Sequence, residues 1–255
     1  MGGKLTMTNY NYTKSNKYTD LYEVYRNCSG PGGLKLAEFL ADKMGVKQGD
    51  KLLDVGTNSG YQTCFLAKEY STFIVGIDPW GDSVKELMDN ARKWKIEANV
   101  LGIKAGIPDT DFADSCFDKV YATTTLEMLR GMNGAKGYKE AVEEIYRVLK
   151  PGGIFGLGEP MHNDVEIPEE IYPYVTKGDM PAPWTECFAT LEETIEVLKS
   201  VGFEIIEADR APDAQLWWEE YGKYDPYASE PGEDGEVIEK DKGRWVTFGY
   251  IIAKK

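Results

Sequence analysis

The chain of 255 residues is 42% hydrophobic and 28% charged, and its 43 acidic and 29 basic side chains give a formal net charge of −14. This composition is typical of a globular, enzyme-sized protein and excludes the disordered and collagen-like classes. An acidic chain without a local basic stripe repels phosphates, so we expect no nucleic-acid partner. No apolar run reaches the ~18 residues of a membrane-spanning helix, so we expect no membrane partner.

The cysteines and the histidine bear on metal binding and on location. The four cysteines lie far apart without a CxxC pair, and His162 is the one histidine. A structural metal site needs clustered thiols or imidazoles. We therefore expect no bound metal. Nothing at the N-terminus resembles the apolar core of an export signal, and the sparse cysteines favour a reduced, cytoplasmic setting.

The first half of the chain alternates strands with helices. Residues 1–33 form a polar, tyrosine-rich arm with one helical stretch near 19–26, and the SGPGG segment at 29–33 ends it. Apolar residues then recur at helical spacing from 34 to 44. Short branched runs predict strands at 51–55, 72–77, 100–103, 118–123 and 154–158, with helices at 60–70 and 83–94. This order predicts a doubly wound α/β fold with a mostly parallel sheet.

The second half has a different character. Residues 160–189 contain five prolines and scattered aromatics, which predicts a lid. A helix at 191–202 begins with a capping box of Thr190 and Glu193. Strands at 203–208 and 244–253 raise the total to seven, and the second can pair antiparallel at the sheet edge. Between them, an insertion at 210–243 contains a helical stretch at 214–224 and an acidic stretch at 229–243 that we expect to be an exposed loop. We thus predict one domain, 34–255, behind the arm.

The first predicted strand leads into a glycine turn. The segment LLDVGTNSG (52–60) has Asp54 near the end of the strand, and Gly56 and Gly60 bracket the turn into the next helix. Glycines let the backbone approach a ligand, and ligands of parallel sheets bind beyond the carboxyl ends of the strands. Asn58 stands where a dinucleotide fold needs its second glycine, so pyrophosphate fits poorly.

This DxGxxxG pattern resembles the first motif of class I S-adenosylmethionine (SAM) methyltransferases. Three further matches follow in order: Asp78 at the end of the second strand, CFDKVYATTTLEML (116–129) and EIYRVLKPGGIFGLGEP (144–160). The third-strand Gly-Asp of that family is replaced by KAGIPD (104–109), which leaves the partner of the adenine amino group open. The resemblance implies a Rossmann-like methyltransferase fold with SAM as cofactor and S-adenosylhomocysteine as product. It implies that the cofactor is held by Ser29, Gly30, Asp54, Gly56, Thr57, Asn58, Gly60, Asp78, Pro79, Trp80 and Thr123.

The arm shows a second resemblance. KYTDLYEVYRNCSGPGGL (17–34) is similar to the start of phosphoethanolamine and related small-amine N-methyltransferases, in which the arm closes over SAM. On the matching positions, the resemblance implies that Tyr18 and Tyr25 lie beside the methyl acceptor. Glu127 stands at or beside the place of that family's histidine, and the lid lacks an arginine cluster. A phosphorylated acceptor is therefore not expected.

Methyl transfer from a sulfonium needs collinear reactants and a dry site, and an amine must also lose a proton. We predict Glu127, with Tyr18 as neighbour, to take that proton. The alternative is that Glu127 only provides a negative charge at the N-terminus of a helix. His162 after the fifth strand is a second candidate, and a plain surface histidine is its alternative. Aromatic faces attract cations. The aromatic residues expected to border the acceptor are Tyr25, Trp184, Trp217, Trp218 and Tyr221.

Adjacent residues on a helix point about 100° apart, so Trp217 and Trp218 cannot face one ligand equally, and at least one of them is expected to pack. The sequence thus predicts a SAM-dependent methyltransferase for a small molecule, with an amine nitrogen or sulfur as acceptor atom. A non-catalytic sensor that binds SAM or a nucleoside, and an enzyme that uses the sulfonium for different chemistry, are the alternatives. The acceptor and the oligomeric state stay open.

Overall fold

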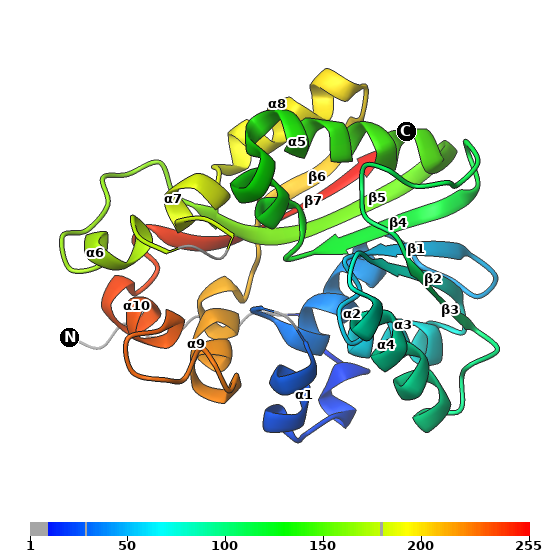
Figure 1. Cartoon of the computed structure of the whole chain (residues 1–255), viewed down its shortest axis with the longest axis horizontal. Coiled ribbons are helices and arrows are strands. Elements are labelled where there is room, and N and C mark those ends of the chain that lie inside the picture. Colours follow the sequence, from blue (N-terminus) through cyan, green and yellow to red (C-terminus); the bar gives the residue numbers. More distant parts are fainter. Residues whose placement is uncertain (1–9, 29, 179–180) are drawn as a thin grey trace.

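The computed structural model describes residues 10–28, 30–178 and 181–255. Within them, seven strands form one sheet in the order β3-β2-β1-β4-β5-β7-β6 (Figure 1). The strands are β1 (Lys51–Val55), β2 (Phe73–Asp78), β3 (Val100–Lys104), β4 (Phe117–Thr123), β5 (Leu149–His162), β6 (Glu204–Arg210) and β7 (Val246–Lys254).

Strands β1 to β5 pair in parallel, and β7 runs antiparallel to both β5 and β6. The doubly wound, mostly parallel seven-stranded sheet predicted from the sequence is confirmed. The strand order reverses between β1 and β4, and ligands of such sheets bind at this point.

Helices cover both faces of this sheet. They are α1 (Leu21–Asn27), α2 (Gly33–Lys43), α3 (Tyr61–Tyr70), α4 (Gly81–Lys93), α5 (Leu126–Val148), α6 (Tyr172–Val175), α7 (Trp184–Cys187), α8 (Leu191–Val201), α9 (Ala214–Tyr224) and α10 (Asp234–Asp241), with a 3-10 turn at Ser15–Lys17. Helices α5 and α8 lie on one face, and α2, α3 and α4 lie on the other (Figure 1). Apolar side chains from each layer and the sheet form two buried clusters, one on each face. The capping box of Thr190 and Glu193 at the start of α8 is present as predicted.

Strand β5 is much longer than the run 154–158 that its sequence predicts. It extends to His162 because each residue from Ile154 onward has an antiparallel partner in β7, ending with His162 opposite Val246. Pro160 has no backbone N–H to donate. The antiparallel pairing with β7 tolerates this, so the strand continues through Pro160. The first residues of the predicted lid are therefore sheet, and Glu159 is held rigidly in a strand.

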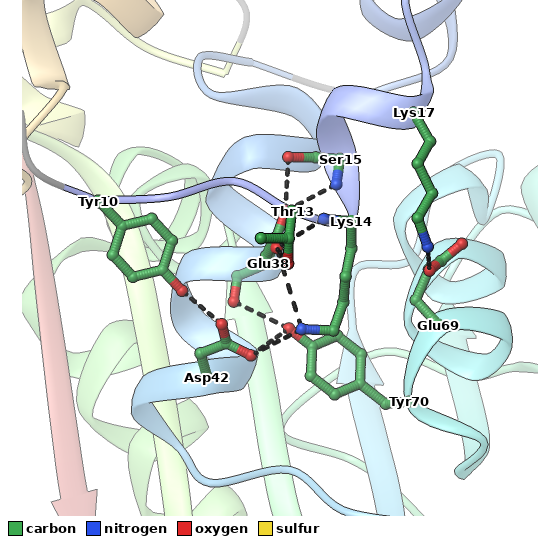
Figure 2. Close-up of polar contacts among 9 residues, drawn as sticks. All are labelled: Tyr10, Thr13, Lys14, Ser15, Lys17, Glu38, Asp42, Glu69 and Tyr70. Carbon is green, nitrogen blue, oxygen red and sulfur yellow. Dashed lines mark hydrogen bonds and ion pairs between the residues drawn. The ribbon is translucent and has the colours of Figure 1, made fainter.

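The predicted N-terminal arm is more deeply embedded than a surface arm. Glu38 of α2 is fully buried, and its carboxylate accepts hydrogen bonds from the backbone N–H of Lys14 (2.9 Å), from the backbone N–H of Ser15 (2.7 Å) and from Ser15 Oγ (2.7 Å) (Figure 2). Tyr10 and Tyr70 donate to Asp42 beside it. A buried carboxylate on the domain thus satisfies the backbone donors of the arm.

The acidic stretch 229–243 is not the exposed loop that its composition predicts. It contains α10, which packs against α9 with Val237 and Ile238 buried. Asp241 is also buried and accepts hydrogen bonds from the backbone N–H groups of Trp245 and Val246, which attaches α10 to β7. The apolar pair is too short to give a periodic signal, so only the packing reveals this helix.

In the described part of the chain, no helix is both long and apolar enough to cross a membrane. The same residues contain no cluster of three metal-ligating side chains.

Candidate active site

The glycine turn after β1 is tied to the next strand. Gly56 adopts φ +75°, and the backbone N–H groups of Gly56 and Thr57 donate to the Ile77 carbonyl at 2.9 and 3.0 Å. Gly60 begins α3 with φ +72°, and a Cβ there would clash with the Leu87 side chain. Both positions therefore require glycine, because of their backbone conformation and the close approach.

Two aspartates flank this turn with different partners. Asp54 is buried and accepts a hydrogen bond from Thr63 Oγ1 at 2.5 Å. Burial raises the pKa of Asp54 to about 7, against the lowering effect of Thr63 and Thr57. Asp78 is 3% exposed, and its two oxygens accept from the backbone N–H groups of Asn58 and Trp80, each at 3.0 Å.

Asp78 therefore connects the loops after β1 and β2. A carboxylate has about four lone-pair sites, so two remain for the hydroxyls of a ligand. Pro79 and Trp80 follow directly at the surface, where Trp80 is 64% exposed. An exposed tryptophan beside a carboxylate can provide one wall for a flat ring.

The arm covers the same loops. Ser59 Oγ donates to the Asn27 carbonyl at 2.7 Å, and Gln62 Nε2 donates to the Gly33 carbonyl at 2.8 Å. Gln62 Oε1 accepts from Thr123 Oγ1 at 2.8 Å, which joins the arm to the end of β4. Gly30 has φ +82°, and a Cβ there would lie 2.6 Å from the Thr124 side chain. Ser29, predicted to bind the cofactor, lies outside the described residues.

A cavity of about 560 Å³ opens beside the arm and the loop after β4. Its lining includes Gly30 of the arm, Thr124 of the loop after β4 and Glu127 at the start of α5. Its walls come from the lid, α9, α10 and the segments between them, and are largely aromatic. The aromatic lining residues are Tyr174, Trp184, Phe188, Trp218, Tyr221 and Tyr227.

The cavity is lined by more acidic than basic residues. Glu127, Glu233 and Asp234 line it, and Lys177 is the one cation among its described lining residues. Glu127 is 4% exposed, and its Oε2 has no hydrogen-bond partner in the described chain. Burial, and then the nearby Glu159 carboxylate, raise the pKa of Glu127 well above its usual range. Burial raises the pKa of Asp234 to about 6, although Tyr221 donates to it at 3.1 Å.

Two of the predicted acceptor residues are placed elsewhere. Tyr18 stacks on Trp94 at 5.3 Å between ring centroids and donates to Glu69 at 3.1 Å, so it packs on the outer side of α3. Tyr25 is buried and donates to Glu220 of α9 at 3.0 Å. Neither lines the cavity, because the arm uses these rings to attach itself to the domain. Their position beside the methyl acceptor stays a prediction, and the structure places neither ring on this cavity.

His162 is also outside the cavity. Its ring stacks on Trp245 at 5.1 Å between centroids, and its Nδ1 lies 3.0 Å from the Asn163 carbonyl. Because β5 runs on beyond the rim, His162 reaches a second cavity of about 460 Å³, together with Arg130 and Glu193. A direct role at the acceptor is not supported by this position.

The tryptophan pair divides as the helical spacing predicts. Trp217 is fully buried between Phe39 and Phe248 and belongs to the core. Trp218 lines the cavity, and its Nε1 donates to the Thr247 carbonyl at 3.1 Å. Trp184 and Tyr221 line the cavity as predicted.

Several lining residues were missed by the sequence analysis. Phe188, Tyr174 and Tyr227 carry no motif, and only the folding of the lid and the insertion brings them together. Glu233 and Asp234 were assigned to the expected exposed loop. A usable signal existed for Glu159, which is the last residue but one of the LKPGG-containing match, in a strand that leads to the ligand edge.

The parallel sheet with its antiparallel β7, the glycine turn after β1 and the carboxylate after β2 define the class I methyltransferase architecture. Residues 53–157 match the family model of the methyltransferase domain. This region therefore resembles a methyltransferase domain, in agreement with the resemblance of its motifs to class I methyltransferases.

The relatives by sequence include sterol 24-C-methyltransferases. Sterol 24-C-methyltransferase erg6 of Schizosaccharomyces pombe is 30% identical over 69% of this chain and 45% of its own length. The chain spans about half the length of the curated relatives it matches.

Among solved structures, phosphoethanolamine N-methyltransferase 2 of Haemonchus contortus with SAM has a TM-score of 0.74 at 20% identity, over 97% of this chain and 58% of its own. Geranyl diphosphate C-methyltransferase of Streptomyces coelicolor A3(2) has a TM-score of 0.70 at 17% identity, over 86% of this chain and 77% of its own. At these identities the likeness is one of fold.

Proposed function

We propose that the protein transfers the methyl group of SAM to a small molecule held in the aromatic, acidic cavity. One observation carries this proposal. Gly30 and Thr124 line the cavity, and Thr125, next to Thr124, packs closely against Gly56 of the glycine turn, so a donor beside Asp78 and an acceptor in the cavity can lie end to end. Bound SAM supplies an electrophilic methyl group and leaves as S-adenosylhomocysteine.

The cavity supports an acceptor atom that gains positive charge. Glu127, Glu233 and Asp234 face it against the single Lys177, and aromatic faces attract cations in a dry site. A methylated amine nitrogen or sulfur becomes cationic, and so does an alkene that is methylated at carbon. An amine nitrogen or sulfur, the acceptor that the sequence predicts, is our first candidate.

Carbon is the second candidate acceptor. The sterol 24-C-methyltransferases among the relatives are named for a carbon acceptor. The same carboxylates and rings would stabilise a carbocation, and one of its protons would then have to leave. The two candidates therefore make the same demand on the cavity: stabilise a cation, then remove a proton.

The residues of this chain would act by position. The arm covers the loops through Asn27 and Gly33 and excludes water from the reacting atoms. The proton released by the methylated acceptor passes to the Glu127 carboxyl. We also propose a cytoplasmic location, supported by the four free thiols.

The function is tested with calorimetry and labelled SAM. We expect SAM and S-adenosylhomocysteine to bind, and ¹³C-methyl SAM to label a product from pools of amines, thioethers or unsaturated lipids. The NMR shift of the labelled methyl group separates nitrogen, sulfur and carbon attachment. Binding without turnover on any pool would favour the sensor, and a nucleoside product other than S-adenosylhomocysteine would favour different sulfonium chemistry.

The substitution Glu127→Gln tests proton removal. We expect kcat to fall about 100-fold or more, because positioned acid–base groups contribute 10²–10⁴-fold. SAM affinity should not change, since Glu127 lies on the acceptor side. Glu143→Gln on the outer face of α5 is the matched control and should keep full activity. Unchanged turnover in Glu127→Gln would remove this residue from the reaction.

The substitution Trp184→Ala tests the aromatic wall. Trp184 packs on Trp218 and Phe188, with centroids 5.6 and 5.0 Å away. We expect the KM of the acceptor to rise about tenfold, which corresponds to ~1.4 kcal/mol of lost contact. Tyr172→Ala in the same lid removes a 56% exposed ring that does not line the cavity, and it should leave KM unchanged. Equal effects of both variants would indicate general loosening of the lid.

A further inference from the structure

Two buried carboxyl groups lie together between the acceptor cavity and the second cavity. Glu127, on the first turn of α5, lines the acceptor cavity. Glu159 of β5 is 2% exposed, and its Oε1 accepts a hydrogen bond from Tyr138 at 2.7 Å. The backbone of Glu127 also lowers the pKa of the Glu159 carboxyl group, against the raising effect of burial. The proposed function uses the first carboxyl group and gives no task to the second.

Unpaired polar atoms concentrate at this pair. Among the described residues, Glu127 Oε2, Glu159 Oε2, and Nε and Nη2 of Arg130 are buried without a hydrogen-bond partner. The Arg130 guanidinium lies over the Tyr138 ring, 4.1 Å from its centroid. Buried polar groups in proteins are nearly always hydrogen-bonded, so an unpaired cluster marks a place where protons or water are exchanged.

The cluster extends from one cavity to the other. Arg130 lines the second cavity together with His162 and Glu193, while Glu127 lines the first. Phe188 lines both, so the wall between them is one side chain thick at that point. A proton that moves from Glu127 past Glu159 towards Arg130 therefore leaves the acceptor side without crossing the cofactor loops.

Electrostatics limits how many protons the pair can lose. Two adjacent carboxylates in a low-dielectric site cannot both ionise freely. Burial raises the pKa of both groups, and the charge of Glu159 raises the pKa of Glu127 further. The groups that face the pair are Tyr138 and Arg130 from α5 and Cys187 from α7, and Arg130 in turn interacts with Glu193 of α8. Glu159 has the hydroxyl donor and the nearby guanidinium, so the single negative charge resides on Glu159 and the proton on Glu127.

We propose that Glu159 is the positioning residue that makes Glu127 a base: Glu127 takes the proton of the methylated acceptor while its own proton passes to Glu159. This inference rests on the proposed methyl transfer. The bond between the acceptor atom and hydrogen breaks, and its electron pair stays on the acceptor. The existing O–H bond of Glu127 breaks as its proton moves to Glu159, where a new O–H bond forms, and the proton of the acceptor forms a new O–H bond on Glu127. The pair thus goes from one negative charge to neutral. A proton then leaves Glu159 to water in the second cavity, which restores the charge.

Infrared titration of the ligand-free protein with ¹³C-labelled glutamate tests the shared proton without any turnover. The label separates glutamate carboxyls from those of Asp54 and Asp234. We expect one protonated glutamate band at neutral pH that Glu127→Gln removes. In Glu159→Gln the Glu127 band should disappear at lower pH than in the wild type, because its negative neighbour is gone. Two ionised carboxylates at neutral pH, or identical titration of Glu127 in both proteins, would overturn the proposal.

Turnover supplies the second readout. The rate should rise with pH as the pair loses its first proton, since the neutral pair cannot accept one. In Glu159→Gln we expect the rate at neutral pH to fall at least tenfold. We also expect the rising, low-pH limb of the pH–rate profile to move to higher pH, because the carboxyl group of Glu127 lacks the hydrogen-bond donors of Glu159. SAM affinity and acceptor KM should stay the same. An unchanged pH profile would contradict the relay.

Two further variants keep the test decisive. Tyr138→Phe retains both carboxyl groups and removes one donor from Glu159, so the low-pH limb should again move to higher pH, even if Glu159→Gln does not fold. Glu143→Gln, on the same helix and facing solvent, should keep the wild-type profile. If no acceptor pool is methylated but the infrared result holds, the proposed function fails and the proton sharing stands. The role of Glu159 would be refuted if Tyr138→Phe showed the wild-type pH profile of turnover and Glu159→Gln were active with an unshifted pH profile.

Discussion

Asp78→Ala is expected to weaken SAM binding about 100-fold or more. The Asp78 carboxylate holds the backbone N–H groups of Asn58 and Trp80 and retains lone pairs for the ligand. A hydrogen bond to a charged group contributes ~1.5–3 kcal/mol, and about 3 kcal/mol corresponds to a ~100-fold change in affinity. The substitution removes both the ligand contacts and the connection between the loops after β1 and β2. Isothermal calorimetry with SAM and S-adenosylhomocysteine measures the loss.

The control for this substitution is Asp82→Ala. Asp82 is an exposed carboxylate in the first turn of α4, a few residues further along the chain. Asp82 has the same charge without the two backbone contacts. The affinity for SAM should therefore change by no more than about two- to threefold. Equal losses in the two variants would mean that the overall negative field matters and the position of Asp78 does not. Wild-type affinity in Asp78→Ala would refute the assigned cofactor site.

Glu38→Ala is expected to release the N-terminal arm. Its buried carboxylate accepts from two backbone N–H groups and from Ser15 Oγ (Figure 2). Each buried donor left without a partner costs about 1–3 kcal/mol, so keeping the arm in place would cost at least ~3 kcal/mol. Local opening of the arm is cheaper than unfolding the domain. We expect rapid hydrogen exchange in residues 12–28 and faster dissociation of bound SAM.

Asp42→Ala is the matched control for the arm. Asp42 lies one helical turn further along α2 and accepts from Tyr10 and Tyr70, and its side chain is 38% exposed. Water can replace it as an acceptor, so the arm should open much less. Proteolysis after Lys14 or Lys17 in the native protein gives an independent measure. Identical cleavage of Glu38→Ala and wild type would show that the arm does not depend on this carboxylate.

Local sequence patterns predicted most of the sheet correctly. The run 51–55 is strand β1, the helix expected at 214–224 is α9, and the capping box at Thr190 is formed. These elements follow from hydrophobic periodicity and capping, which act over a few residues. The length of β5 was not predicted, because its second half exists only through pairing with β7, a strand almost a hundred residues away.

The two halves of the site differ in the same way. Gly56, Gly60 and Asp78 could be located because turn geometry and strand ends are local features of the chain. The acceptor side was predicted less well: Tyr18 and Tyr25 fasten the arm, and His162 reaches another cavity. The sequence shows the same residue whether a tyrosine packs in the core, hydrogen-bonds to a carboxylate or faces a ligand.

The sequence by itself determined the order of strands and helices, the turn that approaches the cofactor and the acidic character of the chain, because each depends on neighbouring residues. Only the tertiary structure decided which aromatic rings line the cavity, that Glu38 anchors the arm, and that Glu127 and Glu159 are both buried with the charge of Glu159 acting on Glu127. The physical reason is that burial and the field of a nearby charge depend on groups that are distant in the chain and meet only after folding.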